Sequence, residues 1–112
     1  MPALEVGVTI DPIARVRPKT GLVTVSGTVE CNLDTTVDLD AFLTQRSGRL
    51  LVQGGDFEQI ECTAPSTTWS FDIMGSNGRF VAGRATLEAS VFACGDLNSN
   101  FGSATGTIKL RR

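Results

Sequence analysis

The chain has 112 residues, of which 41% are hydrophobic and 20% are charged. We expect one domain over residues 1–112, because roughly 100–150 residues is the commonest domain size and suffices for a core without a structural metal. The 10 basic and 12 acidic residues exclude an overall basic binder of nucleic acid or anionic membranes. No apolar run approaches the roughly 18–20 residues of a membrane span, so none is expected.

The N-terminal segment alternates apolar and polar side chains over residues 4–10, which predicts a half-buried strand. Asp11-Pro12 interrupts the alternation. The strand follows Met1-Pro2-Ala3 directly, without the charged region and apolar stretch of a signal peptide. Two origins fit this start: a protein made without a signal peptide, or a mature chain from which the signal peptide was removed.

The next two strands are predicted at residues 23–31 and 36–44, where apolar and polar side chains again alternate. Gly27 falls in the apolar row of the first of these strands, where it predicts a bulge or a close contact between sheets. A hairpin turn at 46–49 leads into a short strand, which we expect Gly54-Gly55-Asp56 to end.

The second half of the chain continues this pattern of short alternating strands separated by turn residues. A loop at 95–103 is expected before the last strand. The strands expected in this half run over residues 57–63, 68–73, around Phe80, 85–93 and 107–111.

The complete pattern predicts about seven to nine short strands, with turn signals about every 8–12 residues and no segment of helical period. It favours an all-β fold, an immunoglobulin-like antiparallel β-sandwich, over the alternative of a small closed β-barrel. The apolar rows that would form its core contain Val23, Val25, Val29, Val37, Leu39, Leu43, Ile60, Trp69, Phe71, Ile73, Leu87, Val91, Ile108 and Leu110.

Several short runs carry a resemblance to known proteins. Gly27-Thr28-Val29-Glu30-Cys31 is followed by Gln45-Arg46-Ser47-Gly48-Arg49, then by Gly54 or Gly55, and finally by Cys62 and Trp69. Across roughly residues 20–90 this pattern resembles small secreted immunoglobulin-like domains of Gram-positive bacteria, most of them uncharacterised. The eight arginines against two lysines are similar to the composition of actinobacterial proteins. The resemblance implies export and a sandwich fold but no activity, because a fold alone fixes none.

The three cysteines cannot all pair within one chain. Cys31 and Cys62 fall in inward rows, whereas Cys94 falls on the opposite face or beyond a strand end. This parity favours a Cys31–Cys62 disulfide, which closes 62 − 31 = 31 residues and leaves Cys94 as a free thiol. The alternatives are a Cys31–Cys94 bridge and three reduced cysteines. A bridge implies an oxidising compartment, and therefore a secreted or cell-surface protein.

The residue types in the sequence do not favour an enzyme. The chain has no histidine, so the usual nucleophile–histidine pairs and the commonest general base are absent. Asp38 and Asp40 share one strand face at a spacing that would suit inverting glycoside hydrolysis. Alternation with core residues makes them solvated strand residues instead, so we expect the protein not to be an enzyme.

The loop at 95–102 contains the sharpest local motif. Asp96, Asn98 and Asn100 place oxygen side chains at positions 1, 3 and 5, as at the start of a calcium loop. Glycine comes late, at Gly102, and position 12 is Thr107 instead of a bidentate glutamate. We therefore interpret the loop as a turn capped by its own side chains, and we expect no metal and no cofactor.

Apolar residues outside the inward rows are the candidates for an interaction surface. Parity directs Phe42 and Phe92 outward, and Phe101 lies near a loop, as does Phe57. Converging aromatic residues of this kind mark binding surfaces. The alternative is that Phe42 and Phe92 cover each other across one sheet.

These observations favour a non-catalytic extracellular immunoglobulin-like domain that binds an unidentified protein or cell-surface partner. The alternative is a structural subunit of an ordered assembly, such as a surface fibre or virion decoration. In that case the strand at 4–10 would pair with a neighbouring copy, giving self-association.

Overall fold

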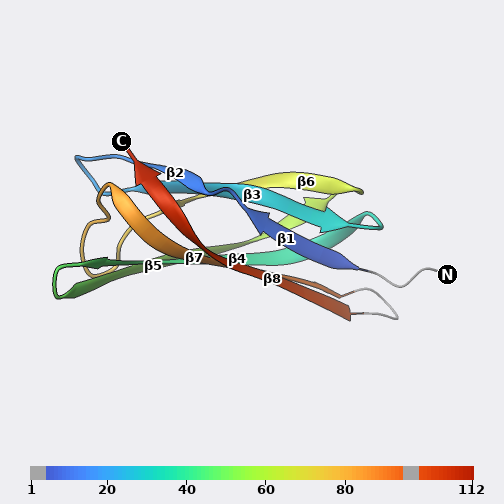
Figure 1. Ribbon diagram of the computed structural model, residues 1–112. Helices are drawn as coiled ribbons and strands as arrows, with labels where there is room; N and C mark the ends of the chain where they lie inside the picture. The colour runs from blue at the N-terminus through green and yellow to red at the C-terminus, as the bar shows by residue number, and fades with distance from the viewer. Residues whose placement is uncertain (1–4, 95–98) are drawn as a thin grey trace.

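A computed structural model describes residues 5–94 and 99–112. This part of the chain contains eight β-strands and no helix that could cross a membrane (Figure 1). The strands are β1 (Val6–Ile10), β2 (Ile13–Val16), β3 (Val23–Cys31), β4 (Thr35–Ser47), β5 (Leu50–Cys62), β6 (Ser66–Ile73), β7 (Gly83–Cys94) and β8 (Ser99–Arg111).

The strands form two layers that face each other along an elongated molecule of 51 × 20 × 19 Å (Figure 1). In one layer, β3 pairs antiparallel with β1 on one side and with β6 on the other. The second layer has the order β2-β8-β7-β4-β5, in which only the β2–β8 pairing is parallel. A short β2–β3 pairing joins the layers at one edge. The predicted antiparallel β-sandwich is therefore confirmed.

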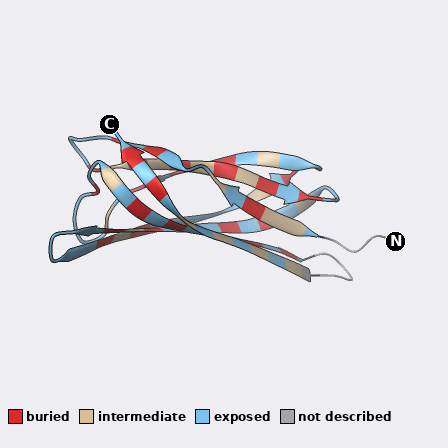
Figure 2. Cartoon of the chain, in the orientation of Figure 1, coloured by how far each residue is buried: buried red, intermediate tan, exposed pale blue. Residues whose placement is uncertain are grey.

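The core lies between the layers, where the inward rows of both sheets meet. Buried and exposed residues alternate along the strands, as the period of two requires (Figure 2). Every residue predicted for the apolar rows is buried except Ile60, which is half-buried and packs against the core. Trp69 and Phe71 contact each other there, with ring centroids 5.5 Å apart.

Gly27 marks a close approach of two strands, β1 and β3, and not a bulge. The pairings of β3 with β1 and with β6 run through this position without a break in register. A Cβ atom at Gly27 would lie 2.0 Å from the carbonyl oxygen of Thr9, a distance that no side chain tolerates. The absence of a side chain therefore allows β1 to pass close to β3.

The prediction that Gly54-Gly55-Asp56 ends a strand is wrong, because β5 continues unbroken through these residues. β4 pairs with β5 along the whole length, from Ser47↔Leu50 to Thr35↔Cys62. Gly54 serves a close contact instead, since a Cβ atom there would lie 2.2 Å from the carbonyl oxygen of Met74.

Two further boundaries differ from the sequence prediction. No strand forms around Phe80, which lies in the β6–β7 connection with its side chain fully buried. The loop expected at 95–103 is shorter, because β8 already begins at Ser99 and pairs there with β7. The first difference arises from packing of Phe80 in the core, and the second from extension of the β7–β8 hairpin, in which Ser99 pairs with Cys94.

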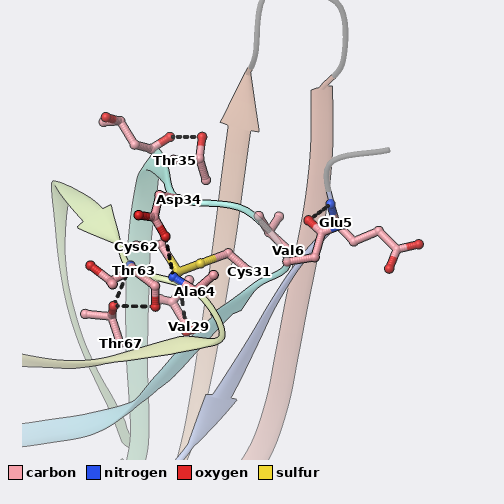
Figure 3. The surroundings of a disulfide bond; sticks show 12 residues. Glu5, Val6, Val29, Cys31, Asp34, Thr35, Cys62, Thr63, Ala64 and Thr67 are labelled. Atoms are coloured by element: carbon pink, nitrogen blue, oxygen red, sulfur yellow. Dashed lines mark hydrogen bonds between the residues drawn. A yellow bond between two sulfur atoms is a disulfide. The ribbon is translucent and has the colours of Figure 1, made fainter. Parts of the chain in front are cut away.

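A disulfide between Cys31 of β3 and Cys62 of β5 joins the two layers near one end of the molecule (Figure 3). Both cysteines are buried, and their Cα atoms are 6.4 Å apart. The predicted pairing is confirmed, and the alternative bridge from Cys31 to Cys94 is wrong. Near the bridge, Asp34 Oδ1 accepts a hydrogen bond of 2.8 Å from the backbone N–H of Ala64, which ties two turns together. The side chain of Cys94 lies outside the described residues, so its free thiol stays a prediction.

Replacing both bridged cysteines, Cys31→Ala with Cys62→Ala, should lower the free energy of unfolding by about 3–4 kcal/mol, because a loop of 31 residues is released. Urea denaturation of the variant and the parent measures this loss. Thiol titration of the denatured, non-reduced parent should find one thiol per chain. Three thiols, or an unchanged stability in the variant, would contradict the bridge.

Gln45 of β4 is the buried polar side chain of the described core, and it holds the β6–β7 connection in place. Its Oε1 accepts a hydrogen bond of 2.9 Å from Val81 N–H. Its Nε2 donates to the carbonyl oxygens of Val81, at 2.8 Å, and Arg84, at 3.2 Å. One side chain therefore binds three backbone groups, two on Val81 of the β6–β7 connection and one on Arg84 at the start of β7.

Gln45→Met should lower the free energy of unfolding by about 1–3 kcal/mol, because methionine fills the space but leaves these part-buried backbone groups without their partner. The matched control is Gln59→Met on β5, where the side chain is exposed and its stability effect should be within about 0.5 kcal/mol. Equal losses in the two variants, measured by urea denaturation, would show that the Gln45 hydrogen bonds do not stabilise the connection.

Candidate functional site

The outer face of the β8-β7-β4-β5 sheet brings together residues that are distant in sequence. Strand register places Phe101 opposite Phe92, and Phe92 opposite Asp38. One step along the sheet, Asp40 lies opposite Phe57. We call this surface the aromatic–acidic face; it consists of Phe42, Phe57, Phe92, Phe101, Asp38 and Asp40.

All four phenylalanines on this face are exposed to solvent. Phe57 is 82% exposed and Phe101 62%, whereas Phe92 and Phe42 are 43% and 42% exposed. The structure therefore places the predicted Phe42, Phe92 and Phe101 together on one sheet face. Phe42 and Phe92 therefore do not shield each other from solvent, as the alternative required.

Two shallow grooves adjoin at Phe57. A groove of about 580 Å³ is lined by Phe57, Phe92 and Phe101 together with Asp38 and Asp40. A second, of about 420 Å³, lies beside Phe42 and shares Asp40, Phe57 and Ser90 with the first. Carboxylates line both grooves, and neither is lined by a lysine or arginine among the described residues. The remaining acidic side chains that line them are Asp56, Glu58 and Glu88.

This combination of groups favours binding of a ligand in which a cationic group lies next to apolar groups. The face of an aromatic ring attracts an ammonium or guanidinium group, and neighbouring carboxylates add to that attraction. The hydrogen bond at Asp38 that crosses to a neighbouring strand is long, with Gln59 Nε2 donating at 3.4 Å. Asp38 thus retains oxygen lone pairs for a ligand.

Asp38 and Asp40 lie on one face of the sheet, as predicted. Both side chains are exposed on an open sheet surface. Two exposed carboxylates on one face can attract a cation through their charge.

The calcium-loop motif falls largely outside the described residues, since Asp96 and Asn98 are not described. Asn100, its third residue, uses Oδ1 to accept a hydrogen bond of 3.1 Å from Val6 N–H. Within residues 5–94 and 99–112, no group of three or more acidic, histidine or cysteine side chains could hold a metal ion. Leu4, the first residue of the predicted N-terminal strand, is likewise not described.

The N-terminal strand lies between elements of its own chain. β1 pairs antiparallel with β3 over its full length, from Val6↔Cys31 to Ile10↔Gly27. It also packs against β8, where a Cβ atom on Gly102 would lie 2.9 Å from the carbonyl oxygen of Val6. β1 thus completes the sandwich of which it is a part.

Comparison with known proteins identifies similarity in structure alone. No protein-family model and no curated protein matches the chain. A β-glucosidase from Listeria innocua, solved in complex with glucose, is 10% identical with a TM-score of 0.46; the match covers 97% of this chain and 16% of that one. The sporulation control protein Spo0M from Bacillus subtilis is 11% identical with a TM-score of 0.38, over 100% of this chain and 51% of that one. The chain thus spans a part of each of these proteins.

Phe57 is the residue of this surface whose position the sequence analysis did not fix. Its expected place near a loop followed from ending the strand at Gly54-Gly55-Asp56, whereas it lies well inside β5. The alternation of Phe57, Gln59 and Glu61 contained the signal for an outward position. Its partner Asp40 required the register of β4 against β5.

Phe42→Ser and Phe92→Ser should each lower the free energy of unfolding by about 1 kcal/mol or less, because half-exposed rings contribute little burial. Phe80→Ser removes a fully buried ring and should cost about 3 kcal/mol or more. Urea denaturation compares the three. Losses at Phe42 and Phe92 as large as that at Phe80 would identify them as core residues and remove them from the binding surface.

Proposed function

We propose that this protein is a non-catalytic, exported immunoglobulin-like domain that binds a protein partner through the aromatic–acidic face. The observation that carries the proposal is the exposed ring of Phe57, at the junction of two grooves lined by carboxylates and free of lysine and arginine. Exposing this much aromatic surface is unfavourable in water unless a partner covers it.

The partner that fits this surface is a polypeptide carrying lysine or arginine beside apolar side chains. Apolar groups of the partner would lie against Phe92 and Phe101, which face each other across β7 and β8. A cationic side chain would contact the ring of Phe57 and the carboxylate of Asp40, its cross-strand neighbour.

Recognition through side chains fits this sheet better than the addition of a strand to its edge. β5 is the terminal strand of its layer. Its backbone N–H at Phe57 already donates a hydrogen bond of 2.8 Å to Asp56 Oδ1. Exposed Asp56 and Glu58 place two charges along this edge, and charged residues on an edge strand oppose pairing with another chain.

Export rests on the disulfide between Cys31 and Cys62, because such bonds persist in oxidising compartments. The resemblance to secreted immunoglobulin-like domains of Gram-positive bacteria agrees with this location. The proposed setting is therefore the medium or the cell surface.

The experiment uses a peptide of about ten residues that alternates arginine and leucine, and a matched peptide with glutamate in place of arginine. Titration followed by amide NMR should shift resonances of β4, β5, β7 and β8 with the basic peptide alone. Combining Phe57→Ser with Asp40→Asn should weaken binding about tenfold or more, because it removes the ring contact and the neighbouring charge.

The matched control is Leu33→Ser, which removes another exposed apolar side chain outside this face and should leave the affinity unchanged. Equal binding of the acidic peptide, or resonance shifts centred on the β1-β3-β6 layer, would contradict the proposal. So would an affinity that the Phe57 and Asp40 changes do not alter.

A further inference from the structure

The positive charges of this protein occupy one end of the molecule. All ten lysines and arginines fall in four stretches of the sequence, residues 15–19, 46–49, 79–84 and 109–112. The fold gathers these stretches around the C-terminus, together with the β2–β3 turn and the tip of the β4–β5 hairpin (Figure 1). We call this region the basic end.

Direct pairings confirm that the four stretches meet. Arg15 of β2 is the register partner of Arg111 of β8, and Arg84 of β7 is the partner of Lys109. The β6–β7 connection lies against the β2–β3 turn, because a Cβ atom added at Gly21 would be 2.8 Å from the Cβ atom of Arg79. Stretch 46–49 is adjacent, since the neighbouring Gln45 side chain bonds Val81 of that connection.

Among the described residues, none of these lysines and arginines forms an ion pair with a carboxylate. Asp72 lies at the end of strand β6 that faces this region, where its carboxylate accepts a hydrogen bond of 2.6 Å from Thr24 Oγ1. Asp34 and Glu61 lie at the opposite end, around the disulfide, and Asp38 and Asp40 on the aromatic–acidic face. The molecule is therefore strongly polarised along its 51 Å axis.

The basic end also exposes aliphatic side chains on two neighbouring segments, the start of β5 and the β6–β7 connection. Leu50 and Leu51 follow the β4–β5 turn, and Met74 and Val81 belong to the β6–β7 connection. Each of the four is between 39% and 54% exposed. The two segments lie side by side, because a Cβ atom at Gly78 would be 3.1 Å from Leu50 Cδ2.

We propose that the basic end docks on an anionic lipid bilayer. The arginines would lie at the level of the lipid phosphates, and Leu50, Leu51, Met74 and Val81 would enter the boundary between headgroups and acyl chains. Basic residues near a membrane gain from anionic lipid, and apolar side chains between them gain from leaving water. The exposed aliphatic residues favour a bilayer over a soluble polyanion, which offers no apolar phase to receive them.

The net charge of −2 does not oppose this contact. At physiological salt a charge acts over about 8 Å, a small part of the 51 Å length of the molecule, so the membrane interacts mainly with the basic end. Carboxylates at the opposite end are repelled by anionic lipid, which directs the long axis away from the surface. The inference is independent of the proposed function, which uses other residues.

The experiment is co-sedimentation of the full chain with vesicles of phosphatidylcholine alone, or with about 30% phosphatidylglycerol. Binding should require phosphatidylglycerol and should fall in 0.5 M salt, because the attraction is electrostatic. Arg46→Gln with Arg49→Gln should weaken it about 25-fold, which is about fivefold for each cation. Both side chains are exposed, so circular dichroism should find the fold intact.

A second variant separates the bilayer from a soluble polyanion. Leu50→Ser with Leu51→Ser should weaken vesicle binding by about tenfold or more, and should leave any affinity for inorganic polyphosphate unchanged. Phe57→Ser, the matched control on the aromatic–acidic face, should leave vesicle binding unchanged. Loss of vesicle binding in Phe57→Ser would place the contact on the other surface.

Three results would overturn the inference. The first is the absence of binding to phosphatidylglycerol vesicles, and the second is equal binding to both vesicle compositions. The third is vesicle binding that is insensitive to the leucine changes while polyphosphate or duplex DNA binds more tightly, which would identify the basic end as a polyanion site. Salt-sensitive self-association without vesicle binding would instead assign the basic end to a second copy of the chain.

Discussion

The register of β4 against its two neighbours is the constraint on which the rest of this structure depends. β4 pairs with β5 over thirteen consecutive positions and with β7 over eight, without a bulge in either ladder. Side chains alternate between faces, so a slip of one residue would exchange the core row for the outer row. The same register that buries Leu39 and Leu43 therefore directs Asp38, Asp40 and Phe42 outward.

Long antiparallel strands also explain how charge becomes separated along the molecule. β4, β5 and β8 each have thirteen residues, so their ends lie far apart, and turns at the same end bring distant parts of the sequence together. Cations placed near strand ends at 15–19, 46–49, 79–84 and 109–112 thus form one region. Carboxylates on the middle and opposite parts of the strands remain at a distance from them.

The two ends are held by different interactions. At the end opposite the basic end, the Cys31–Cys62 disulfide joins the layers directly. Near the basic end, Gln45 binds the backbone of the β6–β7 connection, and buried Phe80 anchors the same segment in the core. The β6–β7 connection, which carries exposed apolar and basic side chains, is therefore held in place by the core. A surface that is already ordered loses less conformational entropy when a partner binds it.

Much of this fold could be predicted from the sequence, because the strands carry a period of two that each segment displays by itself. The strand at 23–31, the inward rows, the pairing of Cys31 with Cys62 and the outward direction of Phe42 and Phe92 all follow from this local pattern. The continuous β5 and the central place of Phe57 did not follow. Gly54 and Gly55 resemble a strand end in sequence, and only pairing with β4 keeps them in the ladder.

For most of the predicted strands, the sequence by itself determined which face is buried and which faces solvent, since burial of one strand face is a local, periodic property. Only the tertiary structure decided which exposed residues become neighbours. Asp40 beside Phe57, and Arg15 beside Arg111, are cross-strand pairs between segments far apart in the chain. A composition of nearly balanced charge contains no information about that arrangement, because the separation of charge arises from the turns that reverse the chain and from the register that aligns its strands.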